Sequence, residues 1–187
     1  GHGVDAIKSK SVRRYGFSGE EIEIGTDFSD RFADEMLIMP RSVSFLQATL
    51  KRRNLVLLDR IYYLIPKSHN LPNLKYVLGV FNCKLTNFWF EYYYESTKVR
   101  GGYFDLNGNQ IKSIPIPHVS KELQDRIAEL VDKVIIGKAD DYTLIITEDS
   151  VIDLLVYHLY ALTYDEVLII DPKTSITRKE YEDFKFE

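Results

Sequence analysis

Cationic side chains gather in the middle of this otherwise acidic chain. Residues 36–118 hold eleven Lys or Arg against four Asp or Glu, whereas the whole chain has a formal net charge of −4. Local charge, more than the total, sets the field that a polyanion meets. The same stretch contains the single Trp and just over half of the aromatic residues. The pattern predicts a lobe that faces nucleic acid, joined to a separate acidic module.

Two short segments offer the clearest contacts. Residues 51–53 are three consecutive cations that could bind phosphates regardless of sequence, although such a run can also be a solvated edge that discourages strand pairing. In residues 98–103, two glycines let the backbone approach a groove, and Arg100 could contact guanine with two hydrogen bonds. The alternative is a simple exposed connection. The predicted DNA contacts are Arg41, Lys51, Arg52, Arg53, Lys98, Arg100, Tyr103 and Lys112.

Residues for catalysis are missing from the sequence. There is no Asn/Asp-Pro-Pro-Tyr/Phe motif to hold a flipped adenine, and no glycine-rich turn after a strand to bind S-adenosylmethionine. The four histidines are scattered without metal-ligand spacing. A divergent metal-dependent nuclease could use Glu21, Glu23 and Asp27, but solvated carboxylates are the more ordinary interpretation. We therefore predict a chain that is not itself an enzyme and holds no cofactor or metal.

Length and composition set broad limits. A chain of 187 residues suffices for one domain with a small appendage. No apolar run approaches the roughly 20 residues that span a bilayer, and no signal peptide opens the sequence. Gly1 and His2 resemble a tag remnant, and a single cysteine fits a reducing cytoplasm.

Local patterns predict short strands in the first half of the chain. Residues 36–41 form an apolar run that Pro40 stops, and residues 55–65 are rich in β-branched and aromatic side chains. Residues 43–50 fit either a strand or a helix. Asn107-Gly108 lies between two short runs, which is the strongest local signal for a hairpin turn.

Helical patterns follow. Asn73 can cap a helix that continues to about Tyr94, with apolar residues at a period near 3.6. Its last residues, 92–94, are predicted to pack against the sheet, with base stacking as the alternative. Ser120 begins a second helix, residues 137–142 read as a linker, and a third helix follows. A capping box predicts a fourth helix that ends at Pro172, and the tail from Lys173 is predicted to fray.

Together these elements predict an α+β fold. We expect a small, twisted, mostly antiparallel sheet with one helix packed across it, followed by a helical C-terminal extension. The predicted organisation is a connecting segment at 1–35, a recognition lobe at 36–118 and a helical module at 119–187.

Several segments resemble one known family. Residues 74–90, LKYVLGVFNCKLTNFWF, are similar to the "LkylLgiLNSkl..fyf" helix of TaqI-like specificity domains. Residues 110–117, QIKSIPIP, resemble that family's "l..lPIP" exit segment, and residues 120–131 the helix after it. Residues 38–41 resemble its entry strand, and residues 156–166 resemble the "vy.lYgLt.eE" ending of such restriction–modification proteins. Cys83 departs from the pattern, because the family usually has Ser there.

This resemblance implies a target-recognition domain of an adenine-specific DNA methyltransferase, most simply one fused to an endonuclease. Such a domain reads double-stranded DNA while other domains of the same polypeptide do the chemistry. S-adenosylmethionine, and Mg²⁺ if the parent cuts DNA, would bind those domains. The alternative function is a protein-interaction scaffold that docks a partner subunit through the acidic C-terminal helices.

Overall fold

The computed structural model describes residues 4–7, 12–14, 16–17, 22–24, 35–51, 56–57, 60–64, 72–140 and 142–186. For residues 138–140 and 142–148, and for the strands before residue 35 and at 56–57, it describes the course of the backbone only.

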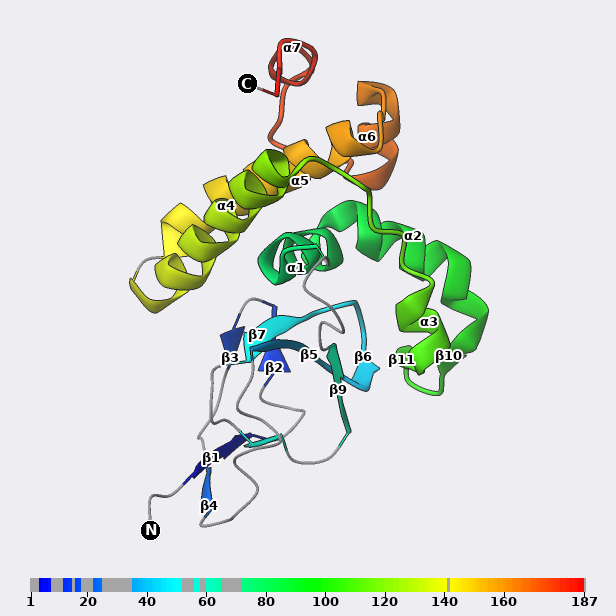
Figure 1. Ribbon diagram of the computed structural model, residues 1–187. Coiled ribbons are helices and arrows are strands. Elements are labelled where there is room, and N and C mark those ends of the chain that lie inside the picture. Colours follow the sequence, from blue (N-terminus) through cyan, green and yellow to red (C-terminus); the bar gives the residue numbers. More distant parts are fainter. Residues whose placement is uncertain are drawn as a thin grey trace.

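Two three-stranded antiparallel sheets are formed by strands between residues 36 and 105 (Figure 1). In the first, β5 (Met36–Pro40) lies between β7 (Thr49–Lys51) and β9 (Ile61–Leu64), and Ile38 is opposite both Thr49 and Tyr63. Every residue of β5 is buried, so this strand is covered on both faces. Such a strand reads as a continuous apolar run, which is the pattern that predicted it.

The second sheet continues directly from the first. Strand β6 (Ser42–Val43) follows β5 after a single residue, Arg41, and pairs with β11 (Tyr103–Asp105), which in turn pairs with β10 (Lys98–Val99). Arg41 therefore lies at the junction of the two sheets.

The remaining strands are described by their backbone. β1 (Val4–Ile7) pairs antiparallel with β4 (Ile22–Ile24) and parallel with β8 (Val56–Leu57), while β2 (Val12–Arg13) pairs with β3 (Gly16–Phe17). The single strand predicted at residues 55–65 is therefore wrong. It forms two pieces in different sheets, and Arg60 adopts a positive φ of 46° just before β9 begins.

The helix predicted from Asn73 to about Tyr94 is two helices, α1 (Leu74–Asn82) and α2 (Lys84–Tyr94). Asn73 caps the first as predicted, since its side chain accepts from the Lys75 amide. The break lies at Cys83, whose extended backbone (ψ 157°) ends one helix and begins the next. The Cys83 sulfur accepts from the Thr86 amide at 3.3 Å, so the thiol fills the N-cap role that serine ordinarily performs.

The hairpin turn lies at Gly101-Gly102, between β10 and β11, and the prediction of a turn at Asn107-Gly108 is wrong. Gly101 and Gly102 have φ values of 101° and 80°, which glycine adopts without strain. Asn107 is extended and forms a capping box with Gln110 at the start of α3 (Gly108–Lys112). Asn-Gly thus serves here as a helix start.

The C-terminal part is helical. The elements are α4 (Lys121–Asp140), α5 (Tyr142–Leu159), α6 (Tyr164–Ile170) and α7 (Arg178–Glu182). The capping box of Thr163 and Glu166 is confirmed. The predicted linker at 137–142 is wrong, because α4 continues to Asp140 and α5 starts at Tyr142. The tail does not fray as predicted: Thr177 and Glu180 form a further capping box for α7.

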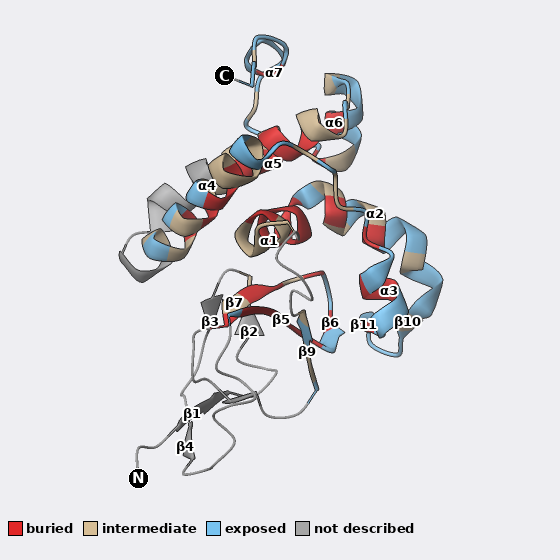
Figure 2. Ribbon diagram, viewed as in Figure 1, coloured by how far each residue is buried: buried red, intermediate tan, exposed pale blue. Residues whose placement is uncertain are grey.

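Helices α4 and α5 share a core with the recognition lobe. One cluster of buried residues includes Leu37 and Met39 of β5, Tyr76 of α1, Val131 of α4 and Leu155 of α5. Figure 2 shows this buried layer running from the sheet through α1 to the inner faces of α4 and α5. The fold is α+β with C-terminal helices, as predicted. Among the described residues, no helix is both long enough and apolar enough to cross a membrane.

Gly79 allows the close approach of α1 to α4 and α5. A Cβ built there would lie 3.0 Å from Ile127 Cγ2 and 3.2 Å from Val131 Cγ2. We expect Gly79→Val to lower the free energy of unfolding by about 2 kcal/mol, because overpacking forces neighbours out of their rotamers. Urea denaturation would measure it. Gly108→Ala is the control, since no atom lies within 4 Å of that Cβ, and an equally stable G79V would contradict the packing.

Candidate nucleic-acid interface

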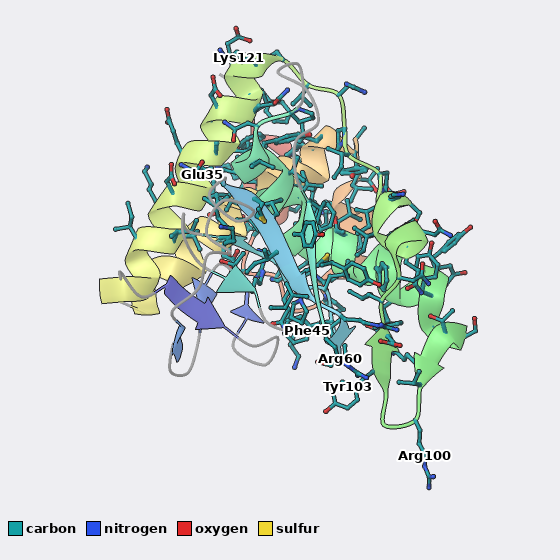
Figure 3. The ribbon with its side chains drawn as sticks, turned by 60° about the horizontal axis from the view of Figure 1, so that its bottom comes forward. Glu35, Phe45, Arg60, Arg100, Tyr103 and Lys121 are labelled. Carbon is teal, nitrogen blue, oxygen red and sulfur yellow. The ribbon has the colours of Figure 1, made fainter. Side chains whose placement is uncertain are left out.

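The β10–β11 hairpin carries the predicted base-reading segment to the outside of the molecule. Gly102 donates its amide to the Val99 carbonyl at 3.0 Å, which closes the turn. Arg100 lies at the tip and its side chain extends away from the body of the protein (Figure 3). Tyr103, the first residue of β11, is 51% exposed. The hairpin therefore presents a cation and an aromatic ring to solvent on a two-stranded support.

Arg41 is joined to Asp105 at the junction of the two sheets. Its Nε donates to Oδ1 at 2.9 Å and its Nη2 donates to Oδ2 at 3.1 Å. Both side chains remain exposed, by 46% and 39%. Hydrogen bonding to Arg41 is the main cause that lowers the pKa of Asp105, so this carboxylate stays ionised near neutral pH.

Arg60 is a member of this site that the sequence did not single out. It is exposed at the start of β9, and its carbonyl accepts from the Arg41 amide at 2.8 Å. Its charge also helps to lower the pKa of Asp105. The sequence held one signal for it. Arg60 interrupts the mostly apolar run of residues 55–65, and a charged residue in such a run is usually exposed.

Exposed aromatic rings lie at the same end of the protein. Phe45, in the loop after β6, is 52% exposed, and Figure 3 shows it at the same end of the protein as Arg60, Tyr103 and Arg100. We call Arg41, Phe45, Arg60, Arg100 and Tyr103 the hairpin face. It combines three guanidinium groups with two rings on connected strands. Exposed apolar groups rimmed by charge are typical of binding surfaces.

Lys98 and Lys112 lie beside this face with different surroundings. Lys98 Nζ pairs with Glu91 at 2.6 Å and sits 5.2 Å from the centre of the Phe104 ring. Its charge is thus partly neutralised within the protein. Lys112, in the last turn of α3, is exposed.

Lys51 is placed differently from the prediction. It is fully buried in β7, opposite Met36, so its ammonium is not offered to a phosphate at the surface. The reason is that Lys51 lies on a strand with its side chain buried, and not in an exposed loop. Arg52 and Arg53 lie outside the described residues.

Comparison with protein families identifies the lobe. Residues 7–116, more than half of the chain and including the whole hairpin face, match the TaqI-like C-terminal specificity domain. The chain belongs to this family. A search among curated proteins returns no match. A specificity domain recognises DNA in restriction–modification and is not catalytic, in agreement with the function predicted from the sequence.

The TaqI-like motifs have clear structural roles in this chain. Asn82 and Cys83 occupy the Asn-Ser positions of the helix motif, where Asn82 holds the backbone of Ala48 and Cys83 caps α2. The exit segment is anchored by two tyrosines: Tyr76 donates to the Pro117 carbonyl at 2.8 Å and Tyr160 to the Pro115 carbonyl at 2.7 Å. Asn82, Cys83 and the two tyrosines therefore hold the fold together, and Arg41 of the entry-strand motif is the motif residue that belongs to the hairpin face.

Other cations of the lobe are neutralised by the acidic C-terminal helices. Lys75 pairs with Asp132 of α4 at 2.6 Å, and Lys84 pairs with Asp171 after α6 at 2.5 Å. Both pairs join the lobe to the C-terminal helices, and the two lysines remain exposed by 31% and 45%.

Of the three tyrosines at the end of α2, Tyr94 is half-buried against the core, whereas the other two are not buried as predicted. Tyr92 is 80% exposed and Tyr93 is 65% exposed, while the Tyr93 ring stacks on Trp89 with centroids 5.4 Å apart. Successive helical residues point in different directions, so only some of the three could face the core.

Within the described part of the chain, no group of three or more His, Cys, Asp or Glu side chains could hold a metal ion. The side chains of the nuclease alternative, Glu21, Glu23 and Asp27, lie outside that part.

Proposed function

We propose that this chain reads a short sequence in double-stranded DNA for a restriction–modification adenine methyltransferase. Catalytic domains of the same polypeptide would lie outside the chain, bind S-adenosylmethionine and act on the site that it recognises. Mg²⁺ would be needed only if the parent also cuts. The chain would work in the cytoplasm, where it meets DNA.

The observation that carries this proposal is the hairpin face itself. Three guanidinium groups and two exposed rings are gathered from β5–β6, β9 and the β10–β11 hairpin in a domain that belongs to a specificity family. Guanidinium groups bind both phosphates and the O6 and N7 atoms of guanine, and rings can contact the methyl group of thymine. Backbone hydrogen bonds hold these strands together, so the backbone positions of Arg41 and Tyr103 keep a fixed spacing.

Titration of the chain against duplex DNA at two salt concentrations tests the proposal. Each phosphate that the protein neutralises releases counterions, so affinity should fall several-fold or more between about 50 and 200 mM salt. A scaffold that docks a protein through its acidic helices would show no such salt dependence and would form a stable complex with a partner subunit. A chain that binds every duplex no better than an unrelated acidic protein would refute the proposal.

Arg100→Ala should relax the preference for one base pair. Because a bidentate contact with guanine contributes roughly 1–3 kcal/mol of discrimination, the variant should bind the preferred and the substituted site almost equally. Selection of binding sites from a random duplex pool would measure the change. Arg178→Ala is the matched control, since Arg178 lies on α7 and pairs with Asp165. Unaltered preference and affinity in R100A would exclude the hairpin tip from base reading.

A double change of Arg52 and Arg53 to Ala gives the contrasting result. Contacts to phosphate carry no sequence information, so this variant should bind all duplexes more weakly while it keeps the same preference.

A further inference from the structure

The pairing of Arg41 with Asp105 uses only one side of the guanidinium group. The hydrogen bonds come from Nε and Nη2, so the carboxylate lies against the side edge. Arginine has five N–H donors. Three of them remain, and two of these, one on Nη1 and one on Nη2, point from the outer end of the group. That end presents two parallel donors, which is the arrangement that two neighbouring acceptors require.

The backbone holds both residues of the pair. The Arg41 amide donates to the Arg60 carbonyl at 2.8 Å, and the Arg41 carbonyl accepts from the Leu106 amide at 2.8 Å. Asp105 ends β11 and is in register with Ser42 of β6. Tyr62 of β9 donates its hydroxyl to the Leu106 carbonyl at 2.9 Å, which ties the end of β11 to the first sheet. The ion pair therefore sits on two sheets locked to each other.

The contribution of this pair to folding is expected to be small. An ion pair with both partners this exposed adds little to stability, because water screens the charges. The pair does restrict the Arg41 side chain, whose free rotamers would otherwise have to be ordered when a ligand binds. The Arg60 carbonyl accepts from the Arg41 amide and the Arg60 side chain is exposed, so this junction carries two arginines against one aspartate.

We propose that Arg41 reads a guanine in the major groove through its outer edge and that Asp105 is the positioning residue that orients it. This inference rests on the proposed function. Guanine presents the O6 and N7 acceptors side by side in the major groove. Adenine keeps the N7 acceptor but presents the N6 amino donor in place of O6, so one of the two Arg41 donors would face another donor. Guanine is therefore the base that the free edge fits.

The test uses the whole chain and the duplex selected from a random pool. Each guanine of that duplex is replaced in turn by 7-deazaguanine, which lacks N7, or by inosine, which lacks only the amino group of the minor groove. At one position, 7-deazaguanine should weaken binding about tenfold, whereas inosine leaves it unchanged. Arg41→Ala should bind the natural and the 7-deaza duplex equally.

Asp105→Asn and Asp105→Ala separate positioning from a structural role. Each variant should keep the melting temperature of the parent chain while losing most of the discrimination between guanine and 7-deazaguanine at that position. Asp165→Asn, which disrupts another exposed arginine pair, between α6 and α7, should keep the full tenfold difference.

The outcomes distinguish the two proposals. If no duplex is preferred, the recognition function itself fails. Another outcome is that one duplex is preferred while replacing Arg41 or Asp105 leaves the effect of 7-deazaguanine unchanged at every guanine. In that case the recognition function stands and this inference is wrong. Loss of affinity in D105N with discrimination fully kept would also overturn it, because that result assigns Asp105 a role other than orienting Arg41.

Discussion

Replacing Asn82 with alanine should lower the free energy of unfolding by about 3 kcal/mol, because two buried backbone groups lose their partner. The Asn82 side chain is buried, and its Oδ1 accepts from the Ala48 amide at 2.9 Å while its Nδ2 donates to the Ala48 carbonyl at 3.0 Å. These bonds fasten the segment between β6 and β7 to the end of α1. Without them, both groups of Ala48 stay dehydrated and unpaired.

Urea denaturation followed by far-UV circular dichroism would measure this loss. Asn82→Asp should cost at least as much at neutral pH, since it keeps the acceptor but replaces the donor with a buried charge. Asn109→Ala is the matched control, because Asn109 is exposed on α3. Stability unchanged in N82A would mean that another group satisfies Ala48.

Asp153→Asn should stabilise the protein at pH 7.5 by about 2 kcal/mol and have little effect near pH 4. Asp153 is 2% exposed, on α5, and its carboxylate accepts from the Lys84 amide at the start of α2. Burial raises the pKa of this group to about 6, because it penalises the charged form more than nearby Arg14 and Lys84 favour it. The folded protein therefore holds a proton that the unfolded chain releases at lower pH.

The direction of the pH dependence follows from that shift. Between the ordinary pKa of an aspartate near 4 and the raised pKa of about 6, the native state binds more protons than the unfolded state, so stability falls as pH rises. Asparagine keeps the acceptor for the Lys84 amide and carries no charge, so it avoids this loss. Unfolding curves at pH 4 and pH 7.5 would measure it.

Asp132→Asn is the control for this prediction, because its ion pair with Lys75 is exposed and should contribute less than about 1 kcal/mol at either pH. A destabilised D153N at pH 7.5 would show that the charge on Asp153 is favourable, through Lys84 and Arg14, and that the proposed sign is wrong.

The elements that the sequence predicted well are those whose signals are local. Residues 36–40 formed the predicted strand because a continuous apolar run can be satisfied only by burial on both faces. The caps at Asn73, Ser120 and Thr163 were predicted correctly because each side-chain oxygen accepts a hydrogen bond from a backbone amide only two or three residues later in the chain. The Gly101-Gly102 segment was recognised as an adaptable loop, and it forms the hairpin turn that presents Arg100.

The errors arose where one local signal admits two structures. Asn107-Gly108 can start a hairpin or cap a helix, and the side chain of Gln110 decides for the cap. Apolar spacing runs through Cys83 without interruption, so the break between α1 and α2 is invisible to periodicity. Capping of α2 by the Cys83 thiol is a role that sequence patterns assign to serine.

The sequence by itself determined that this chain is an α+β protein with a cationic, aromatic lobe, since charge distribution and apolar period are properties of the chain alone. It also supplied Arg41, Arg100 and Tyr103 of the hairpin face. Only the tertiary structure decided that Lys51 is buried, that Lys75 and Lys84 are neutralised by the C-terminal helices, and that Arg60 and Asp105 join Arg41. The reason is that ion pairing and burial depend on which distant segments meet, and Asp105 meets Arg41 across 64 residues of chain.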